Sequence, residues 1–430
     1  MKFGAATHSD QHGPNHSTRS SVRVRSNLAP KPSKLLSLCI LLFFSAGSAL
    51  ALDPSRLVSQ YGYTAWRIQD GYFDGQLTSL AQTVDGYLWI GTVNGLFRFD
   101  GVRFVPLTQL TGQEMPAFIT SLLAARDGSL WIGTDHGLSH WLNSKLINLS
   151  TPPNVESIVE DENGVIWFIY DSLPGMPTAR KRLCQVIGVD SRCYGAADGI
   201  PDMRYSRLAT DTRGNVWLAG FSALVRWNPA SSSSTVYTTK ALQSPSHEGQ
   251  PGIVALAANT DGSIWAGMGF RGPDGGLQQL VNGVWKPFRT LKLDGTSLII
   301  MQLLFDREGS LWLGTNSQGI YRMHGQSVEH FGAAGGLTSD EASHFFEDRE
   351  GNLWLATTQG LDLFRDKRVA TFSSRVRTLA IHAESSLIIE SRCGHHHARR
   401  EQDQCLETPA IEGNVLDKGA VHQRADHRRL

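Results

Sequence analysis

Histidine and cysteine are the residues of this chain best suited to metal binding or catalysis, and they are densest near the C-terminal end. The run Cys393-Gly394-His395-His396-His397 places a thiol beside three imidazoles. Thiolate and imidazole groups are good ligands for zinc and related metals. The surrounding sequence, however, has no periodic pattern and is rich in Arg, His and Gln. We therefore expect no metal site and no cofactor.

Two further cysteines, Cys184 and Cys193, lie nine positions apart. This spacing suits a disulfide across a hairpin or a short loop, and disulfides persist in exported proteins. We expect a Cys184–Cys193 bridge, and two free buried thiols are the alternative.

Acid–base catalysis needs a well-placed His or a pair of carboxylates. Six histidines lie between residues 61 and 373, and no two of them form a His-x-His pair. His140 and His324 fall in predicted strands rather than in loops. The sequence also lacks a Gly-x-Ser-x-Gly nucleophile elbow and a phosphate-binding Gly-rich loop. The residue pattern therefore favours a binding protein over an enzyme.

A repeated motif must position any functional residues in the middle of the chain. Its first copy is Asp85-Gly86-Tyr87-Leu88-Trp89-Ile90-Gly91-Thr92, and six related copies follow. Neighbouring copies are 36 to 50 residues apart, a period typical of propeller blades. The repeated tryptophans are Trp89, Trp131, Trp167, Trp217, Trp265, Trp312 and Trp354.

Each repeat can be divided into four short strands, which in the first copy are residues 78–83, 88–92, 96–99 and 103–106. The Asp-Gly pair favours a tight turn before the second strand. We expect the Trp to fill the space between neighbouring sheets and the following Gly to allow backbones to approach closely. A single four-stranded sheet cannot bury its faces alone. The sequence therefore predicts an all-β fold, a seven-bladed β-propeller of four-stranded antiparallel blades over residues 61–373.

Closure of the ring is ambiguous at this level. Thr64-Ala65-Trp66-Arg67 precedes the first blade and has the pattern of an outermost strand, and Arg368–Phe372 has that pattern as well. Either segment can complete the last blade.

The units Leu-Trp-Ile-Gly-Thr-x-x-Gly-Leu, preceded by Asp-x-x-Gly, resemble the two-component regulator propeller repeats. The opening Trp66…Asp70-Gly71…Leu77-Thr78-Ser79-Leu80 is similar to the start of that family. The resemblance implies the periplasmic sensor region of a histidine kinase or hybrid two-component sensor. It also implies recognition of a carbohydrate or another small ligand, and a homodimer, since sensor kinases act as dimers.

The sequence departs from that family after the seventh repeat. The family usually continues into a second propeller, a β-sandwich, a membrane helix and a kinase core, and none of these is recognisable here. We interpret the chain as a truncated histidine kinase sensor without kinase activity. The repeat stops at Ser374, so we interpret residues 374–430 as a disordered or out-of-frame tail.

The first 51 residues have the order of a secretory signal peptide. Basic residues up to Lys34 precede an apolar run over residues 35–44, and Ala49-Leu50-Ala51 supplies a cleavage site. An uncleaved anchor is the alternative, because residues 35–52 are just long enough to span a bilayer. We expect export to the periplasm, with membrane contact only through this leader or a missing C-terminal part.

The partner that we expect is a small molecule or an oligosaccharide. Acidic residues outnumber basic ones between the leader and the tail, and no basic stripe is present. Nucleic-acid binding is therefore excluded, because it needs clustered Lys and Arg.

Loops at one face of the ring are the expected ligand site, because function on repeated folds lies in loops. Most loops between the second and third strands are short, but two are expanded, over Tyr170–Arg182 and Gly267–Gly276. Amide and guanidinium groups suit sugar hydroxyls and carboxylates. The predicted ligand-binding rim consists of Asn94, His136, Arg180, Arg271, Asp274, Asn316, Gln318 and Gln359.

Two other function classes stay open. A streptogramin-lyase-like enzyme would share the propeller fold, but it would need a His, acidic residues and magnesium at the channel mouth. A protein-binding scaffold would instead present a flat apolar face. A polar pocket at the channel mouth would favour the sensor.

Overall fold

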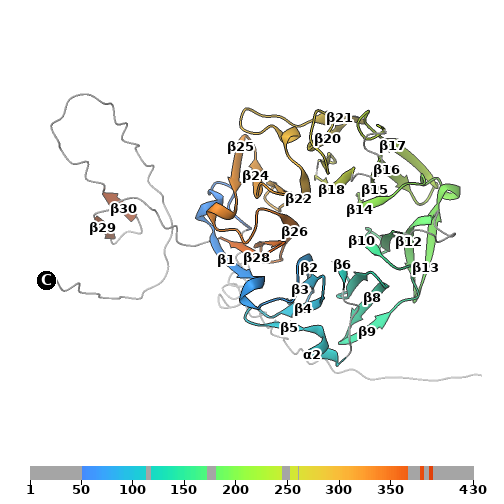
Figure 1. The fold of residues 1–430 in the computed structure, drawn as a ribbon, viewed down its shortest axis with the longest axis horizontal. Helices are drawn as coiled ribbons and strands as arrows, with labels where there is room; N and C mark the ends of the chain where they lie inside the picture. The colour runs from blue at the N-terminus through green and yellow to red at the C-terminus, as the bar shows by residue number, and fades with distance from the viewer. Residues whose placement is uncertain are drawn as a thin grey trace, which may run out of the picture. The chain divides into compact units, whose positions relative to one another are not determined.

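The fold is a ring of seven antiparallel sheets, each with four strands, as the sequence predicts (Figure 1). The computed structural model describes residues 51–112, 118–171, 181–244, 252–259, 261–366, 378–381 and 387–390. The expected leader and most of the expected tail lie outside this described part. Among the described residues, no helix is both long enough and apolar enough to cross a membrane.

Every blade runs from an innermost strand a to an outermost strand d. In the order a to d the blades are β2 (Leu77–Gln82), β3 (Leu88–Thr92), β4 (Gly95–Phe99) and β5 (Phe104–Pro106); β6 (Ile119–Ala124), β7 (Leu130–Thr134), β8 (Gly137–Leu142) and β9 (Lys145–Asn148); β10 (Val155–Glu160), β11 (Ile166–Tyr170), β12 (Lys181–Ile187) and β13 (Asp190–Gly195); β14 (Tyr205–Thr210), β15 (Val216–Gly220), β16 (Leu224–Asn228) and β17 (Ser233–Tyr237); β18 (Ile253–Ala258), β19 (Ile264–Met268), β20 (Leu277–Val281) and β21 (Val284–Pro287); β22 (Ile300–Phe305), β23 (Leu311–Thr315), β24 (Ile320–His324) and β25 (Ser327–Phe331); and β26 (Ala342–Glu347), β27 (Leu353–Thr357), β28 (Gly360–Arg365) and β1 (Gly62–Arg67).

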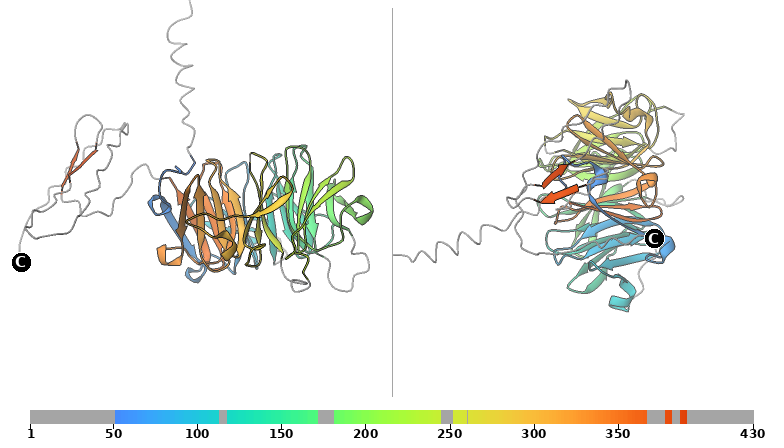
Figure 2. Two further views of the ribbon diagram at one scale, coloured as in Figure 1. Left: turned by 90° about the horizontal axis from the view of Figure 1, so that it is seen from above. Right: turned by 90° about the vertical axis from the view of Figure 1, so that its left-hand side faces the viewer.

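Short helical segments lie between some of the blades. They are η1 (Val58–Gln60), η2 (Ile68–Asp70), α2 (Leu107–Thr111), η3 (Ala196–Asp198), η5 (Gly295–Ser297) and η6 (Ala333–Gly335). A separate hairpin in the expected tail pairs β29 (Thr378–Ile381) with β30 (Leu387–Glu390). Figure 2 gives edge-on views of the ring. Because the strands alternate in direction, b–c and d–a loops share one face, here called the mouth face. The a–b and c–d turns share the opposite face, here called the turn face.

One carboxylate in the a–b turn joins the turn to the core of its blade. In blade 3 the indole Nε1 of Trp167 donates to Asp161 Oδ2 at 3.0 Å. The other oxygen, Asp161 Oδ1, accepts from the backbone N–H groups of Asn163 and Val165. Asp is thus favoured at the first position of Asp-x-x-Gly, because it satisfies a buried indole donor and closes the turn. The same contact, at 2.8 Å, joins Trp217 to Asp211, Trp312 to Asp306 and Trp354 to Asp348.

The Gly after the repeated Trp allows the next blade to pack closely, as expected. A Cβ atom added to Gly91 would lie 2.7 Å from the Ile119 side chain on strand a of blade 2. A Cβ on Gly314 would lie 2.6 Å from Ala342 on strand a of blade 7. Both distances are shorter than van der Waals contact, so only Gly permits this blade spacing.

Arginines of the a–b turns clamp neighbouring blades together at the turn face. Arg126 of blade 2 donates its backbone N–H to Glu160 and its guanidinium to the carbonyl oxygen of Glu162, both in blade 3. Arg307 of blade 6 makes the equivalent bonds to Glu347 and to the carbonyl of Arg349 in blade 7. The blade 2–3 and blade 6–7 junctions are therefore built on the same plan.

The N-terminal strand closes the ring. Strand β1 contains the segment Thr64-Ala65-Trp66-Arg67 and pairs antiparallel with β28, so that blade 7 takes its outermost strand from the other end of the propeller (Figure 1). Trp66 stacks on Trp354 with ring centroids 5.8 Å apart. The other candidate for closure, Arg368–Phe372, lies outside the described residues.

A buried carboxylate, Asp362, lies at this closure. It accepts from the backbone N–H and hydroxyl of Thr338 and from the hydroxyl of Tyr63 on β1. Burial raises the pKa of Asp362 to about 6, although these hydrogen bonds oppose the rise. The folded protein therefore binds the Asp362 proton more tightly than the unfolded chain does.

The raised pKa predicts a pH dependence of stability. The raised pKa of Asp362 contributes most to the free energy of unfolding below the unfolded pKa near 4. This contribution falls as the pH rises to about 6 and does not change above that. In the wild type, this fall lowers the free energy of unfolding by up to about 3 kcal/mol. We expect the fall to be absent in Asp362→Asn, because Asn does not titrate. Urea unfolding at pH 4.5 and pH 7 measures it, and identical pH profiles for the variant and the wild type would contradict this assignment.

Cys184 and Cys193 form a disulfide within blade 3. They are directly paired across the antiparallel hairpin of β12 and β13. Cys184 is fully buried and belongs to the core between blades 2 and 3, with Val155 and Phe168.

The disulfide predicts sensitivity of stability to reductant. Replacing both cysteines with Ala is expected to lower the free energy of unfolding by about 2–3 kcal/mol, because the loop constraint on the unfolded chain is lost. Reductant should lower the stability of the wild type and leave the double variant unchanged. Alkylation of Cys184 and Cys193 themselves, located by peptide mapping of unreduced and denatured protein, would show that the bridge does not form.

Candidate functional site

The b–c turns of four blades share one hydrogen-bond pattern at the mouth face. In blade 1 the hydroxyl of Thr92 donates to the Gly95 carbonyl at 2.9 Å and accepts from the Asn94 backbone N–H at 3.1 Å. Blades 2, 6 and 7 repeat the pattern. The final Thr of the repeat therefore shapes the turn and leaves the side chain beyond it directed outward. The residues whose backbone N–H groups donate to the Thr hydroxyls are Asn94, His136, Gln318 and Gln359.

The structure places these predicted rim residues at equivalent turn positions around the ring, with different local partners. The Asn94 amide donates to Asp74 at 3.3 Å. His136 Nδ1 lies 2.8 Å from its neighbour Asp135, and its side chain is 70% exposed. Gln359 is exposed.

The remaining predicted rim residues lie in other loops. Asp274 accepts from the Ala241 backbone N–H at 3.2 Å, and so ties the expanded blade 5 loop to the segment before that blade. Arg271 is exposed and Asn316 is half-buried. Arg180 lies outside the described residues. Within the described part of the chain, no hydrogen bond or ion pair joins two of the eight predicted rim residues.

A charged group that the sequence did not reveal lies at the mouth face of blades 3 and 4. Asp171, at the start of the expanded blade 3 loop, accepts from Arg182 at 3.2 Å and from Arg204 at 2.6 Å. Arg204 also lies 4.6 Å from the centroid of the Phe221 ring. With two residues of the innermost strands these form the mouth cluster, which consists of Glu156, Asp171, Arg182, Arg204 and Arg207.

Burial controls the charges on the two inner members of the mouth cluster. It raises the pKa of Glu156, and the Arg207 guanidinium opposes that rise. It also lowers the pKa of Arg207, and the Glu156 carboxylate opposes that fall. Among the described residues nothing donates a hydrogen bond to the Glu156 side chain, whereas Arg207 donates to the Ser206 carbonyl at 2.8 Å. The pair therefore keeps hydrogen-bonding capacity for a polar ligand.

His344 of blade 7 lies within electrostatic reach of this pair. Burial, together with the positive charge of Arg207, lowers the pKa of His344 to about 4. The imidazole is therefore neutral at physiological pH and is not a cation of the site.

Strand a carries the signal from which the inner residues could have been found. Blades 1 and 2 have Thr-Ser at the second and third positions of this strand, as in Thr78-Ser79. Blades 3, 4 and 7 have Glu156, Arg207 and His344 at one of these two positions. Charged residues are seldom buried unless they are paired, so these strand positions mark a candidate site that the loop sequences alone do not indicate.

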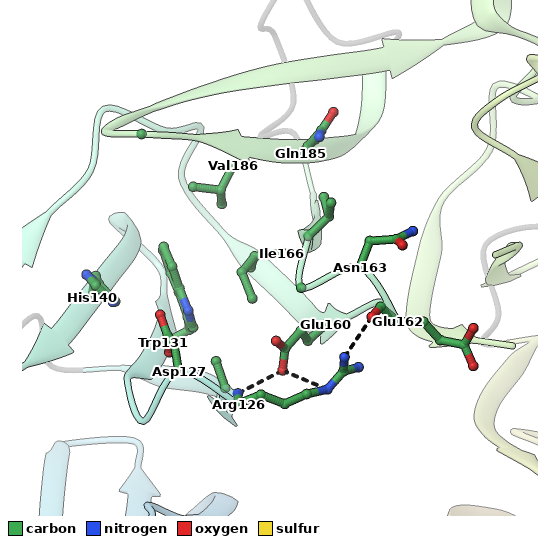
Figure 3. A pocket seen from close by; sticks show the side chains of 14 residues that line it. Arg126, Asp127, Trp131, His140, Glu160, Glu162, Asn163, Ile166, Gln185 and Val186 are labelled. Carbon is green, nitrogen blue, oxygen red and sulfur yellow. Dashed lines mark hydrogen bonds and ion pairs between the residues drawn. The ribbon is translucent and has the colours of Figure 1, made fainter. Parts of the chain in front are cut away.

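Two cavities lie at the opposite, turn face. The first, groove 2–3, has a volume of about 700 Å³ and lies between the a–b turns of blades 2 and 3 (Figure 3). The second, groove 4–5, has a volume of about 560 Å³ and lies between blades 4 and 5. Neither groove is lined by a predicted rim residue. The described residues contain no group of three or more His, Cys, Asp or Glu side chains that could hold a metal ion.

Comparison with protein families identifies the repeats. Residues 114–136 and 336–359 match the family described as two component regulator propeller. These two segments fall in blades 2 and 7, and they confirm the resemblance of the repeats to the two-component regulator propeller family. None of the curated proteins compared with the chain matches it.

Solved structures share the fold at low sequence identity. The extracellular domain of the hybrid two component system BT4673 from B. thetaiotaomicron has 18% identity and a TM-score of 0.58, over 76% of this chain and 44% of that one. The corresponding domain of BT3049 has 16% identity and a TM-score of 0.58, over 76% and 46%. The chain thus spans less than half the length of these two domains. A catalytically inactive virginiamycin B lyase from Staphylococcus aureus, solved with quinupristin, has 14% identity and a TM-score of 0.55, over 71% and 99%.

The mouth cluster predicts energetic coupling between its two inner residues. Arg207→Gln should destabilise the propeller by about 1–3 kcal/mol, because it leaves the Glu156 charge buried without compensation. Adding Glu156→Gln should recover part of that loss, with a coupling energy of about 1 kcal/mol. Urea unfolding of both single variants and the double variant measures this coupling energy. Strictly additive effects on the free energy of unfolding would contradict an interaction between Glu156 and Arg207.

Proposed function

We propose that this propeller is the extracytoplasmic sensing module of a two-component system and binds a small polar molecule at its mouth face. The repeat family and the fold shared with extracellular domains of hybrid two component systems support this role. The observation that carries the proposal is the Glu156 carboxylate, which is half-buried and lacks a hydrogen bond among the described residues beside two arginines.

The chemistry of the mouth cluster suits a carbohydrate, and a sugar acid in particular. Glu156 can accept from sugar hydroxyls, while Arg204 and Arg207 can donate to hydroxyls or to a carboxylate. Asp171 holds the Arg204 guanidinium in place before a ligand arrives, which lowers the entropy cost of binding. The proposed role is binding, with the signal passed to a kinase that is not part of the described structure.

A binding series tests the proposal. Uronic-acid oligosaccharides and neutral oligosaccharides of matched length would be titrated into the purified propeller by calorimetry. We expect the acidic series to bind more tightly, and Arg204→Ala to weaken binding about tenfold or more, the equivalent of one lost charged hydrogen bond.

Arg289→Ala is the matched control, because Arg289 also pairs with one aspartate and is as exposed as Arg204, but it follows blade 5 and lies outside the mouth cluster. Its affinity should equal that of the wild type. Binding that is unaffected by Arg204→Ala and Glu156→Gln would place the ligand elsewhere, and absence of saturable binding across both series would refute the carbohydrate assignment.

A further inference from the structure

The chain fills one of its own grooves at the turn face. Residues 51–61 lie between blades 6 and 7, where Leu52, Val58 and Tyr61 are buried with Trp312 and Phe364. A Cβ added to Gly351, in the a–b turn of blade 7, would lie 2.5 Å from Ala51 Cα. This junction is called groove 6–7 below.

Polar contacts fix the backbone of this segment in groove 6–7. Arg322, 2% exposed, donates to the carbonyl of Pro54 at 3.3 Å, to the carbonyl of Arg56 and to the Tyr61 hydroxyl. Glu329 accepts from the Val58 backbone N–H at 2.6 Å. The groove therefore holds a peptide segment that contains a turn and the helix η1, and it contacts carbonyl and N–H groups of this segment as well as apolar side chains.

Groove 2–3 has the same construction. The clamp of Arg126 on Glu160 and Glu162 repeats the clamp of Arg307 in groove 6–7 (Figure 3). Trp131 corresponds to Trp312, and His140, paired with Trp131 across β7 and β8, corresponds to Arg322. The two residue pairs occupy equivalent positions on strands b and c, so the same strand positions line both grooves.

Unlike groove 6–7, groove 2–3 is not filled by a described segment of the chain. A Cβ on Gly164, the counterpart of Gly351, would meet only a Glu160 carboxylate oxygen at 3.7 Å. No described residue of the chain lies where Ala51 lies in groove 6–7, and the cavity there measures about 700 Å³.

Two buried polar atoms of the wall have no partner. Ala125 stands where blades 3, 4, 6 and 7 have the Asp that accepts from the repeated Trp. Among the described residues, neither Trp131 Nε1 nor His140 Nε2 has a hydrogen-bond partner. Trp131 is only 7% exposed, and a buried donor without an acceptor is costly. Groove 2–3 is thus a cavity with unsatisfied polar atoms at its wall.

We propose that groove 2–3 binds a peptide segment of a partner protein, in the way that groove 6–7 holds residues 51–61. The partner segment differs in one respect. Ile147 replaces Glu329 and Gly188 replaces Asp366, which pairs with Arg56 at 2.9 Å in groove 6–7. Ile187 and Val189 beside the groove are 53% and 63% exposed. The segment is therefore aliphatic where residues 51–61 carry Arg56.

The test uses two synthetic peptides and the whole propeller. One peptide copies residues 52–61, and the other carries Arg56→Leu in the same sequence. We expect the Leu peptide to bind the wild type more tightly and to shift the indole N–H resonance of Trp131. Ile187→Glu should weaken its binding at least tenfold, because it places a carboxylate beside the aliphatic side chain of the peptide. That variant should fold, since Ile187 is 53% exposed.

Val284→Glu is the matched control, because it introduces the same charge at a similarly exposed position of blade 5, outside groove 2–3; it should leave binding unchanged. No saturable binding of the Leu peptide, or equal binding to the wild type and Ile187→Glu, would overturn the proposal. Tighter binding of the native peptide would overturn the assigned aliphatic preference.

Discussion

The hydrogen bond between the repeated Trp and the Asp of the a–b turn is the interaction on which the propeller depends. A large indole fills the space between two blades, and its N–H would be a buried unsatisfied donor without an acceptor from the same blade. The Asp supplies that acceptor with one oxygen and closes the turn with the other, as in Asp161. One side chain therefore fixes the position of the Trp, the turn and the face that the next blade covers.

Blades 1 and 2 lack the Asp that accepts from the repeated Trp, and they differ in what replaces it. Blade 1 substitutes the hydroxyl of Thr83, which still accepts from Trp89 at 2.9 Å. Blade 2 substitutes Ala125 and leaves the Trp131 donor without a partner among the described residues. The second substitution costs stability and opens a cavity, a combination more typical of a binding site than of a structural repeat.

The sequence predicted the blades well because their determinants are local. The strands expected at 88–92 and 96–99 correspond to β3 and β4, with a one-residue difference at the start of β4. Closure could not be decided, because β1 and β28 are far apart in the sequence and two segments had suitable patterns. The mouth cluster was missed for a related reason: Glu156, Asp171 and Arg204 come from two blades, and only the ring brings them together. The seven predicted rim residues in the described part of the chain lie in loops, as turn chemistry requires, but the sequence pattern of one blade does not indicate which residues of the next blade lie beside it.

Blade 3 contributes to both candidate sites, and its construction explains how they can coexist. Strand β12 carries Arg182 toward the mouth cluster and Gln185 and Val186 toward groove 2–3. Cys184 lies between these two ends and is joined to β13 by the disulfide. The cross-linked hairpin is a stiff support, so groups at both ends are positioned before any ligand arrives and binding loses little side-chain entropy. Because the two sites open on opposite faces of the ring, a mouth ligand and a peptide in groove 2–3 do not compete for the same space.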